Sequence, residues 1–217
     1  MTDALAGGLI PNNRLFFFSV MAATAQARGP RQDNRREHLL DAAAGLICQH
    51  GYHGTSMRDI ARATDMLPGS IYYHFPSKEE LLLAVYAEGV RRIAERVDSA
   101  IGRTRDPMKR LEAACVAHLE MLLADSDYAQ VVVRVLPGDV PAVSDRLTAL
   151  RDDYEDRFRG LIAALPLPRS RRRYARLTLL GALNGAQAWY RPGGDTPAHI
   201  ARRVLECLRQ PIGDTAP

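Results

Sequence analysis

The sequence has little of what marks fibrous, disordered or membrane-spanning chains. Its 217 residues include only 16 glycines and 13 prolines, too few for a fibrous or low-complexity protein. Hydrophobic residues make up 47%, which excludes intrinsic disorder. No apolar run approaches the roughly 18–20 residues of a membrane span. The length therefore supports a folded protein of one large or two small domains, with no membrane partner.

Cysteine is also scarce. Cys48, Cys115 and Cys207 are far apart and odd in number, which argues against a disulfide framework. There is no CxxC pair or Cys–His cluster with zinc-ligand spacing, and no GxGxxG, P-loop, HExxH or GxSxG motif. We therefore expect a cytoplasmic protein with reduced thiols that has no metal and no cofactor and is not an enzyme.

Lysine is almost absent, since only Lys78 and Lys109 are lysines among the 29 basic residues. The net charge of +4 permits an acidic partner such as nucleic acid, but a high-GC coding bias gives the same arginine excess. Arginines gather before the first helix, at Arg28, Arg31, Arg35 and Arg36. They predict either an arm that enters the minor groove or a solvated tail.

The first thirty residues resemble a short signal peptide. An apolar stretch follows Arg14 and precedes Ala25-Gln26-Ala27. Because a cytosolic motif comes next, we favour a mis-assigned start, with Met21 rather than Met1 as the true one. Residues 1–30 are therefore expected to form an extension without a fold of their own.

Beyond Arg31, apolar residues recur at helical spacing in almost every segment. The run Val131–Val135 has strand composition, but a lone strand has no partner, so we assign it to a helix. The prediction is an all-α protein. The first expected helix covers 34–50, and the second begins after its N-cap, Thr55. The others cover 68–74, 78–101, 107–124, 127–136, 141–165, 170–190 and 197–209.

The second and third of these helices form a helix-turn-helix arrangement. Thr55 is the expected N-cap of the second helix, and Pro68 suits the first position of the third. Ile71 and Phe75 would anchor the third helix to the core. A capping box at residues 77–80 starts the long helix that follows. In this arrangement the second helix of the pair lies in the DNA major groove.

The runs Thr55–Ala61 and Gly69–Leu82 resemble the N-terminal domain of the TetR family of transcriptional regulators, over about residues 35–82. The resemblance implies a three-helix DNA-binding domain at residues 31–80 and a helical ligand-binding and dimerisation domain at 81–217. Many members have Ser or Thr capping the third helix, where this chain has Leu67, which leaves one phosphate contact in doubt. Carried over by position, the DNA-facing residues are Ser56, Arg58, Pro68, Gly69, Ser70, Tyr72, Tyr73, His74 and Lys78.

Polar side chains on the apolar faces of the later helices mark a candidate ligand site, although we favour a satisfied core role for His118 and Tyr154. The ending Trp189–Gly194 resembles TetR regulators of fatty-acid and steroid degradation, which respond to acyl-CoA esters. The arginines of 169–176 would suit CoA phosphates, with DNA backbone or solvation as alternatives. The predicted ligand-binding residues are His118, Leu122, Tyr154, Phe158, Asn184, Trp189 and Arg173.

Small residues four apart, Gly181 and Gly185, let another helix approach closely, and Ile200, Val204 and Leu208 form a matching stripe. They predict a homodimer interface, with packing inside one chain as the alternative. We therefore expect a dimeric repressor that binds a palindromic double-stranded DNA operator and is released by a small effector such as an acyl-CoA ester. A hydrophobic drug or antibiotic is the alternative effector, and a low-specificity architectural DNA-binding protein the alternative function.

Overall fold

The computed structural model describes residues 30–102, 104–124 and 126–209. The chain divides into two units, Met1–Arg36 and Glu37–Pro217, and the side-chain contacts described below lie within the second. The predicted extension up to residue 29, with the candidate start residues Met1 and Met21 and with Arg28 of the basic arm, lies outside the described residues.

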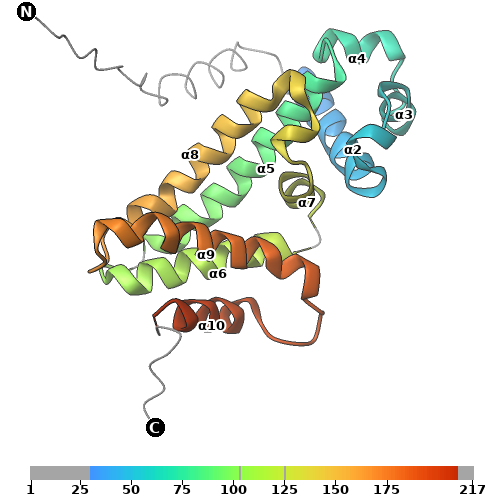
Figure 1. Ribbon diagram of the computed structural model, residues 1–217. Coiled ribbons are helices and arrows are strands. Elements are labelled where there is room, and N and C mark those ends of the chain that lie inside the picture. The colour runs from blue at the N-terminus through green and yellow to red at the C-terminus, as the bar shows by residue number, and fades with distance from the viewer. Residues whose placement is uncertain (1–29, 103, 125, 210–217) are drawn as a thin grey trace, which may run out of the picture. The chain divides into compact units, whose positions relative to one another are not determined.

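Every regular element in these described ranges is a helix, which confirms the all-α prediction (Figure 1). Residues Val131–Val133 belong to a helix and not to a strand. None of the described helices is both long and apolar enough to cross a membrane. The helices are α2 (Pro30–Gly54), α3 (Met57–Ala63), α4 (Pro68–His74), α5 (Lys78–Ile101), α6 (Pro107–Leu123), α7 (Asp127–Arg134), α8 (Ser144–Ala163), α9 (Arg169–Trp189) and α10 (Pro197–Arg209), with short 3₁₀ turns η1 (Pro137–Asp139) and η2 (Pro141–Val143).

The N-cap of α3 is Ser56, so the prediction of Thr55 was wrong by one residue. The Ser56 hydroxyl accepts from the backbone N–H of Asp59, whose carboxylate accepts from the Ser56 N–H at 3.1 Å. This reciprocal box satisfies two donors, which a cap at Thr55 would not do. Thr55 is instead buried, and its hydroxyl lies 3.1 Å from the carbonyl oxygen of Leu46 and 2.9 Å from that of Gly51.

Three other predicted boundaries or caps are corrected. At the start of α5 the Glu80 N–H donates to the Ser77 hydroxyl, but the Glu80 carboxylate pairs with Arg146 and leaves the expected box half formed. Helix α7 ends at Arg134, two residues early. Helix α8 begins at Ser144 rather than 141, because Pro141 opens a 3₁₀ turn of its own.

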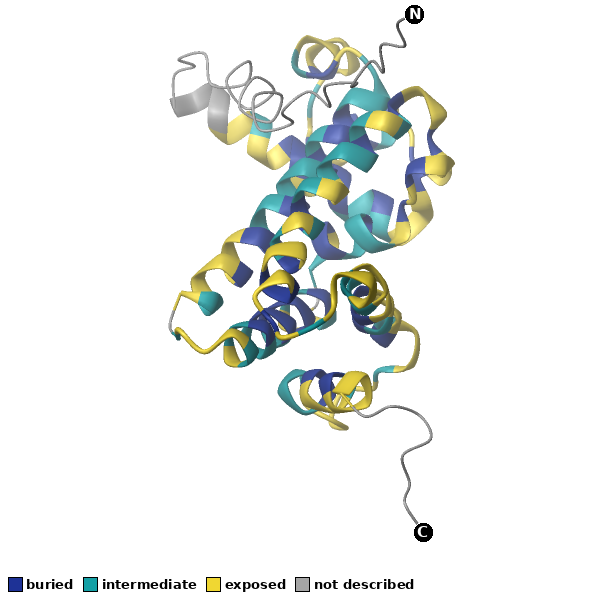
Figure 2. Cartoon of the chain, turned by 60° about the vertical axis from the view of Figure 1, so that its left-hand side comes forward, coloured by how far each residue is buried: buried dark blue, intermediate teal, exposed yellow. Residues whose placement is uncertain are grey.

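Buried residues alternate with exposed ones along the helices, so each helix turns one face inward (Figure 2). Helix α5 has the longest such face, from Leu81 to Val97, and packs against α6, α7 and α8. Its approach to α7 is close at Gly89, where a Cβ atom would lie 2.6 Å from Val132 Cγ2 and 2.8 Å from the Tyr128 carbonyl oxygen. Glycine at residue 89 therefore sets the spacing of the two helices.

Polar contacts join α2 to α7 and α5. The Tyr128 hydroxyl donates to Asp41 at 2.8 Å, and the Arg92 guanidinium lies 4.1 Å from the centre of the Tyr128 ring. At the other end of α7, Arg134 donates to the Cys48 carbonyl oxygen at 3.3 Å. These contacts fix the orientation of α2 relative to the helices that follow it in the chain.

Replacing Gly89 with alanine should destabilise the protein, because the added methyl group meets the backbone of α7. We expect a loss of about 1–2 kcal/mol in the free energy of unfolding, measured by urea titration. Gly160→Ala is the matched control: it lies within α8 with open space around its Cβ position, so helix propensity should make that variant about 0.5–1 kcal/mol more stable. A Gly89→Ala protein as stable as the parent would contradict the close approach.

Candidate nucleic-acid interface and polar core

Helix α4 is anchored on one side and open on the other. Ile71 is fully buried and Phe75 nearly so, as the spacing predicted. Tyr72 and Tyr73 are exposed, and the Tyr73 side chain retains 77% of its accessible surface. Gly69 and Ser70 are also exposed, whereas His74 is half-buried. The helix contains no Asp, Glu, Lys or Arg, so its open face offers hydroxyl groups, aromatic rings and bare backbone to a partner.

The start of α3 presents a different chemistry. Arg58 is exposed there. The Ser56 hydroxyl donates to the Asp59 carboxylate at 2.5 Å while accepting from its N–H, so a new donor bond from the Ser56 hydroxyl would replace its bond to that carboxylate. Hydrogen bonds from the Ser56 side chain and backbone hold the pKa of Asp59 below its usual value. Ser56 can therefore accept a further hydrogen bond more easily than it can donate one.

Lys78 lies in the first turn of α5, where an aromatic ring orients it. Its Nζ atom is 4.0 Å from the centre of the Tyr52 ring, and the Tyr52 hydroxyl donates to Glu79 at 2.9 Å. Partial burial lowers the pKa of Lys78, and burial together with the bond to Glu79 raises the pKa of Tyr52 to about 12. The contact with the ring therefore orients the ammonium group of the residue that begins α5.

The structure brings four of the seven predicted ligand residues together. His118 Nδ1 lies 2.5 Å from the Tyr154 hydroxyl, and His118 Nε2 lies 3.0 Å from Asn184 Oδ1. The Phe158 ring packs edge-on against the imidazole, with centroids 5.8 Å apart. Because the Asn184 oxygen can only accept, Nε2 donates to it and Nδ1 accepts from Tyr154. A hydrogen-bonded chain therefore runs from α8 through α6 to α9.

Burial fixes the charge of this chain. It lowers the pKa of His118 to about 4, although the bond to Asn184 opposes the shift, and it raises the pKa of Tyr154. His118 is consequently neutral near pH 7. Leu122, one turn further along α6, is buried as well, whereas Trp189 and Arg173 are exposed on α9.

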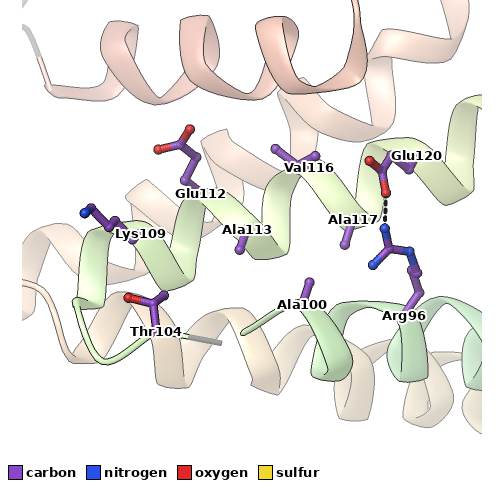
Figure 3. A pocket seen from close by; sticks show the side chains of 9 residues that line it. All are labelled: Arg96, Ala100, Thr104, Lys109, Glu112, Ala113, Val116, Ala117 and Glu120. Atoms are coloured by element: carbon purple, nitrogen blue, oxygen red, sulfur yellow. Dashed lines mark hydrogen bonds and ion pairs between the residues drawn. The ribbon is translucent and has the colours of Figure 1, made fainter. Parts of the chain in front are cut away.

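A groove of about 490 Å³ lies elsewhere, between the end of α5 and the outer face of α6 (Figure 3). None of the predicted ligand residues lines it. Three of its four charged side chains form ion pairs: Arg96 with Glu120 at 2.5 Å, and Glu112 with Arg202 of α10 at 3.4 Å. These residues look like an ordinary solvated helix face in the sequence, so no pattern could have indicated the groove. Among the described residues, no three His, Cys, Asp or Glu side chains are placed to hold a metal ion.

A second open surface lies on α9 and α10. Tyr174, Leu177 and Trp189 are exposed on α9, and Leu208 is exposed on α10. A Cβ atom at Gly181 or Gly185 would meet open space.

Not every residue predicted for the dimer interface is on this surface. Ile200 is only 3% exposed and Val204 is half-buried, because the apolar stripe of α10 packs against α6 and α9 of its own chain. The prediction of an interface contact for Ile200 therefore has no support in the structure.

Comparison with protein families gives two matches along this chain. Residues 39–85 match the model of the bacterial regulatory proteins of the tetR family. Residues 104–212 match the model of the tetracyclin repressor-like C-terminal domain.

Individual relatives agree with these matches. The chain is 33% identical over 101 residues to the HTH-type transcriptional repressor KstR2 of Mycobacterium tuberculosis, a match over 46% of this chain and only 50% of that relative. It is 27% identical over 190 residues to KstR2 of Rhodococcus jostii, covering 82% of this chain and 90% of the relative.

Solved structures share the fold. AibR in complex with isovaleryl coenzyme A and operator DNA superposes with a TM-score of 0.68 at 24% identity, over 80% of this chain and 97% of AibR. Apo AibR gives a TM-score of 0.64 at 26% identity, over 80% and 97%. The two family matches together cover most of the described residues, and the chain belongs to the TetR family of bacterial regulatory proteins.

Proposed function

We propose that the protein is a ligand-responsive transcriptional repressor that binds a palindromic DNA operator as a homodimer. The observation that carries this proposal is the open face of α4, which presents two tyrosines and no charged side chain while Ile71 and Phe75 hold the helix to the core. Such a helix fits the major groove. Proteins of this family are DNA-binding regulators without enzymatic activity.

In this proposal, residues 31–80 form the DNA-binding domain and residues 81–217 form the ligand-binding and dimerisation domain. Lys78 and the tyrosine hydroxyls are suited to phosphate oxygens, which position a protein on DNA. The Ser56 hydroxyl would accept rather than donate because it already donates its proton to the Asp59 carboxylate. The proposed DNA contacts are Ser56, Arg58, Pro68, Gly69, Ser70, Tyr72, Tyr73, His74 and Lys78.

The exposed surface of α9 and α10 is the proposed dimer interface. Gly181 and Gly185 leave room for a helix of a second copy, and the exposed Leu208 and half-buried Val204 add apolar surface on α10. Exposed Tyr174, Leu177 and Trp189 extend the apolar area along α9. Apolar surface of this kind favours a partner. A twofold dimer presents two copies of α4 to the two half-sites of a palindrome.

An acyl-CoA ester is the proposed effector. KstR2 is a repressor, and AibR was solved with isovaleryl coenzyme A, so both features occur among proteins similar to this chain. Three arginines are exposed at the start of α9: Arg169, Arg171 and Arg173. The helix dipole disfavours cations there, so an anionic ligand group would stabilise this end of the helix. The proposed contacts are Arg173, Trp189, Leu122 and the cluster of His118, Tyr154, Phe158 and Asn184.

Lys78→Gln should weaken DNA binding, because the neutral side chain can no longer pair with a phosphate. A dimer has two copies of Lys78, so the slope of log affinity against log salt should become less steep by about 1.8. Lys109→Gln is the matched control, because Lys109 is the chain's other lysine and lies on α6. Titration of a palindromic duplex selected by the protein, at several salt concentrations, measures the slope. Equal slopes for the two variants would contradict a phosphate contact by Lys78.

Acyl-CoA esters should raise the melting temperature. At a concentration one hundred times the Kd, stabilisation of about 2.7 kcal/mol corresponds to a rise of roughly 5–10 °C. The same ester should lower the affinity of the protein for the operator, and the operator should lower the affinity for the ester by the same factor. Free coenzyme A and the free fatty acid are the controls. If no ester shifts the melting temperature but a hydrophobic drug does, the effector proposal is wrong and the drug alternative replaces it.

A further inference from the structure

Leu67 is an exposed apolar side chain next to the helix that the proposed function places in DNA. It retains 77% of its accessible surface, as much as Tyr73 and more than the other large exposed hydrophobic residues that the structure describes. Its backbone is extended, with φ −67° and ψ 140°, directly before Pro68. Met66 beside it packs against the core, so the turn holds one apolar residue inside and the next one in solvent.

This exposure has two costs for the free protein. A leucine side chain in water forgoes the gain of burial. It also occupies the N-cap position of α4, where Ser, Thr, Asp or Asn would satisfy a backbone N–H, and the helix has no side-chain cap. Helices α3 and α5 both have a serine cap. Helix α4 thus lacks the cap that its two neighbours in the chain have, as do α7, α8 and α9 further along.

We propose that Leu67 contacts the C5-methyl group of a thymine in each operator half-site and so determines part of the sequence specificity. This inference rests on the proposed DNA-binding function. In a helix-turn-helix, residues at the start of the second helix contact base edges. This chain offers Leu67, Pro68, Gly69 and Ser70 there, with no Arg, Lys, Asn or Gln to bind guanine or adenine. The thymine methyl is the major-groove group that an apolar side chain matches.

The contact predicts how the protein responds to single methyl groups. Deoxyuridine presents the same hydrogen-bonding groups as thymidine and lacks only the methyl. Without this methyl group, the affinity should fall roughly three- to fourfold for each half-site and roughly tenfold for the symmetric pair. Replacing the same T·A pair by C·G should weaken binding as well, and 5-methylcytosine should recover part of the affinity.

The test uses the full-length protein and a palindromic duplex that it enriches from random-sequence DNA. Each thymine is replaced by deoxyuridine, symmetrically in both half-sites, and the Kd is measured at one salt concentration. One pair of positions should give the tenfold weaker binding with the parent protein. Leu67→Ala should bind the thymine and uracil duplexes equally. Leu136→Ala is the matched control, because Leu136 is 58% exposed and lies outside α4, and it should keep the sensitivity to uracil.

A second variant checks the missing cap independently. Leu67→Ser should supply the side-chain cap and raise the melting temperature while losing the distinction between thymine and uracil. Uracil sensitivity that persists in Leu67→Ala, or an enriched duplex without any sensitive thymine, overturns the contact and leaves the operator proposal standing. Failure to enrich any sequence overturns both.

Discussion

The burial of one face of α5 from Leu81 to Val97 is the constraint on which the rest of the structure depends. Its first turn contains Lys78 and the Glu79 carboxylate that binds Tyr52 of α2. Its middle contains Gly89, where α7 comes within contact of its backbone, and its last buried residue is Val97. Because protein interiors are close-packed, α5 cannot move against α6, α7 or α8 without repacking its other end. The proposed DNA-contacting residue Lys78 is thus on the same helix as part of the core of the proposed ligand-binding domain.

The polar side-chain contacts of α5 orient neighbouring groups more than they stabilise the fold. The Arg92 guanidinium lies over the Tyr128 ring, and its Nε atom is 2.7 Å from Glu88. Arg146 of α8 makes a bidentate pair with Glu80. These groups are partly exposed, so each pair adds little to the free energy of unfolding. They nevertheless join α5 to α7 through Arg92 and Tyr128, and to α8 through Glu80 and Arg146.

The sequence predicted local features, such as helix bounds and buried faces, better than it predicted which distant residues contact one another. Pro68 and Pro76 bracket α4, and Ile71 and Phe75 are four apart, so its length and buried side could be read directly. The α3 cap could also have been predicted, because Ser56 has an acidic residue three positions later and Thr55 does not.

Other features depend on residues distant in the chain. His118 meets Tyr154 and Asn184 across 36 and 66 residues, and an apolar face shows that such groups are buried without showing that they satisfy one another. For the same reason the stripe of Ile200 could not reveal whether its partner was α6 or a second copy.

The positions of the exposed apolar residues give the last step of the argument. Among the described residues, the large ones gather at Leu67–Tyr73 and along α9 and α10 as far as Leu208, with Leu136 apart. Two exposed apolar surfaces of this kind favour a partner for each, and the proposed DNA operator and second copy fit them. Asn184 connects the interior to the second surface, because it is exposed on α9 while it accepts from buried His118. A ligand that displaces the His118 hydrogen bonds would therefore act on α6, α8 and the helix of the proposed dimer interface at once, and α5 packs against the first two.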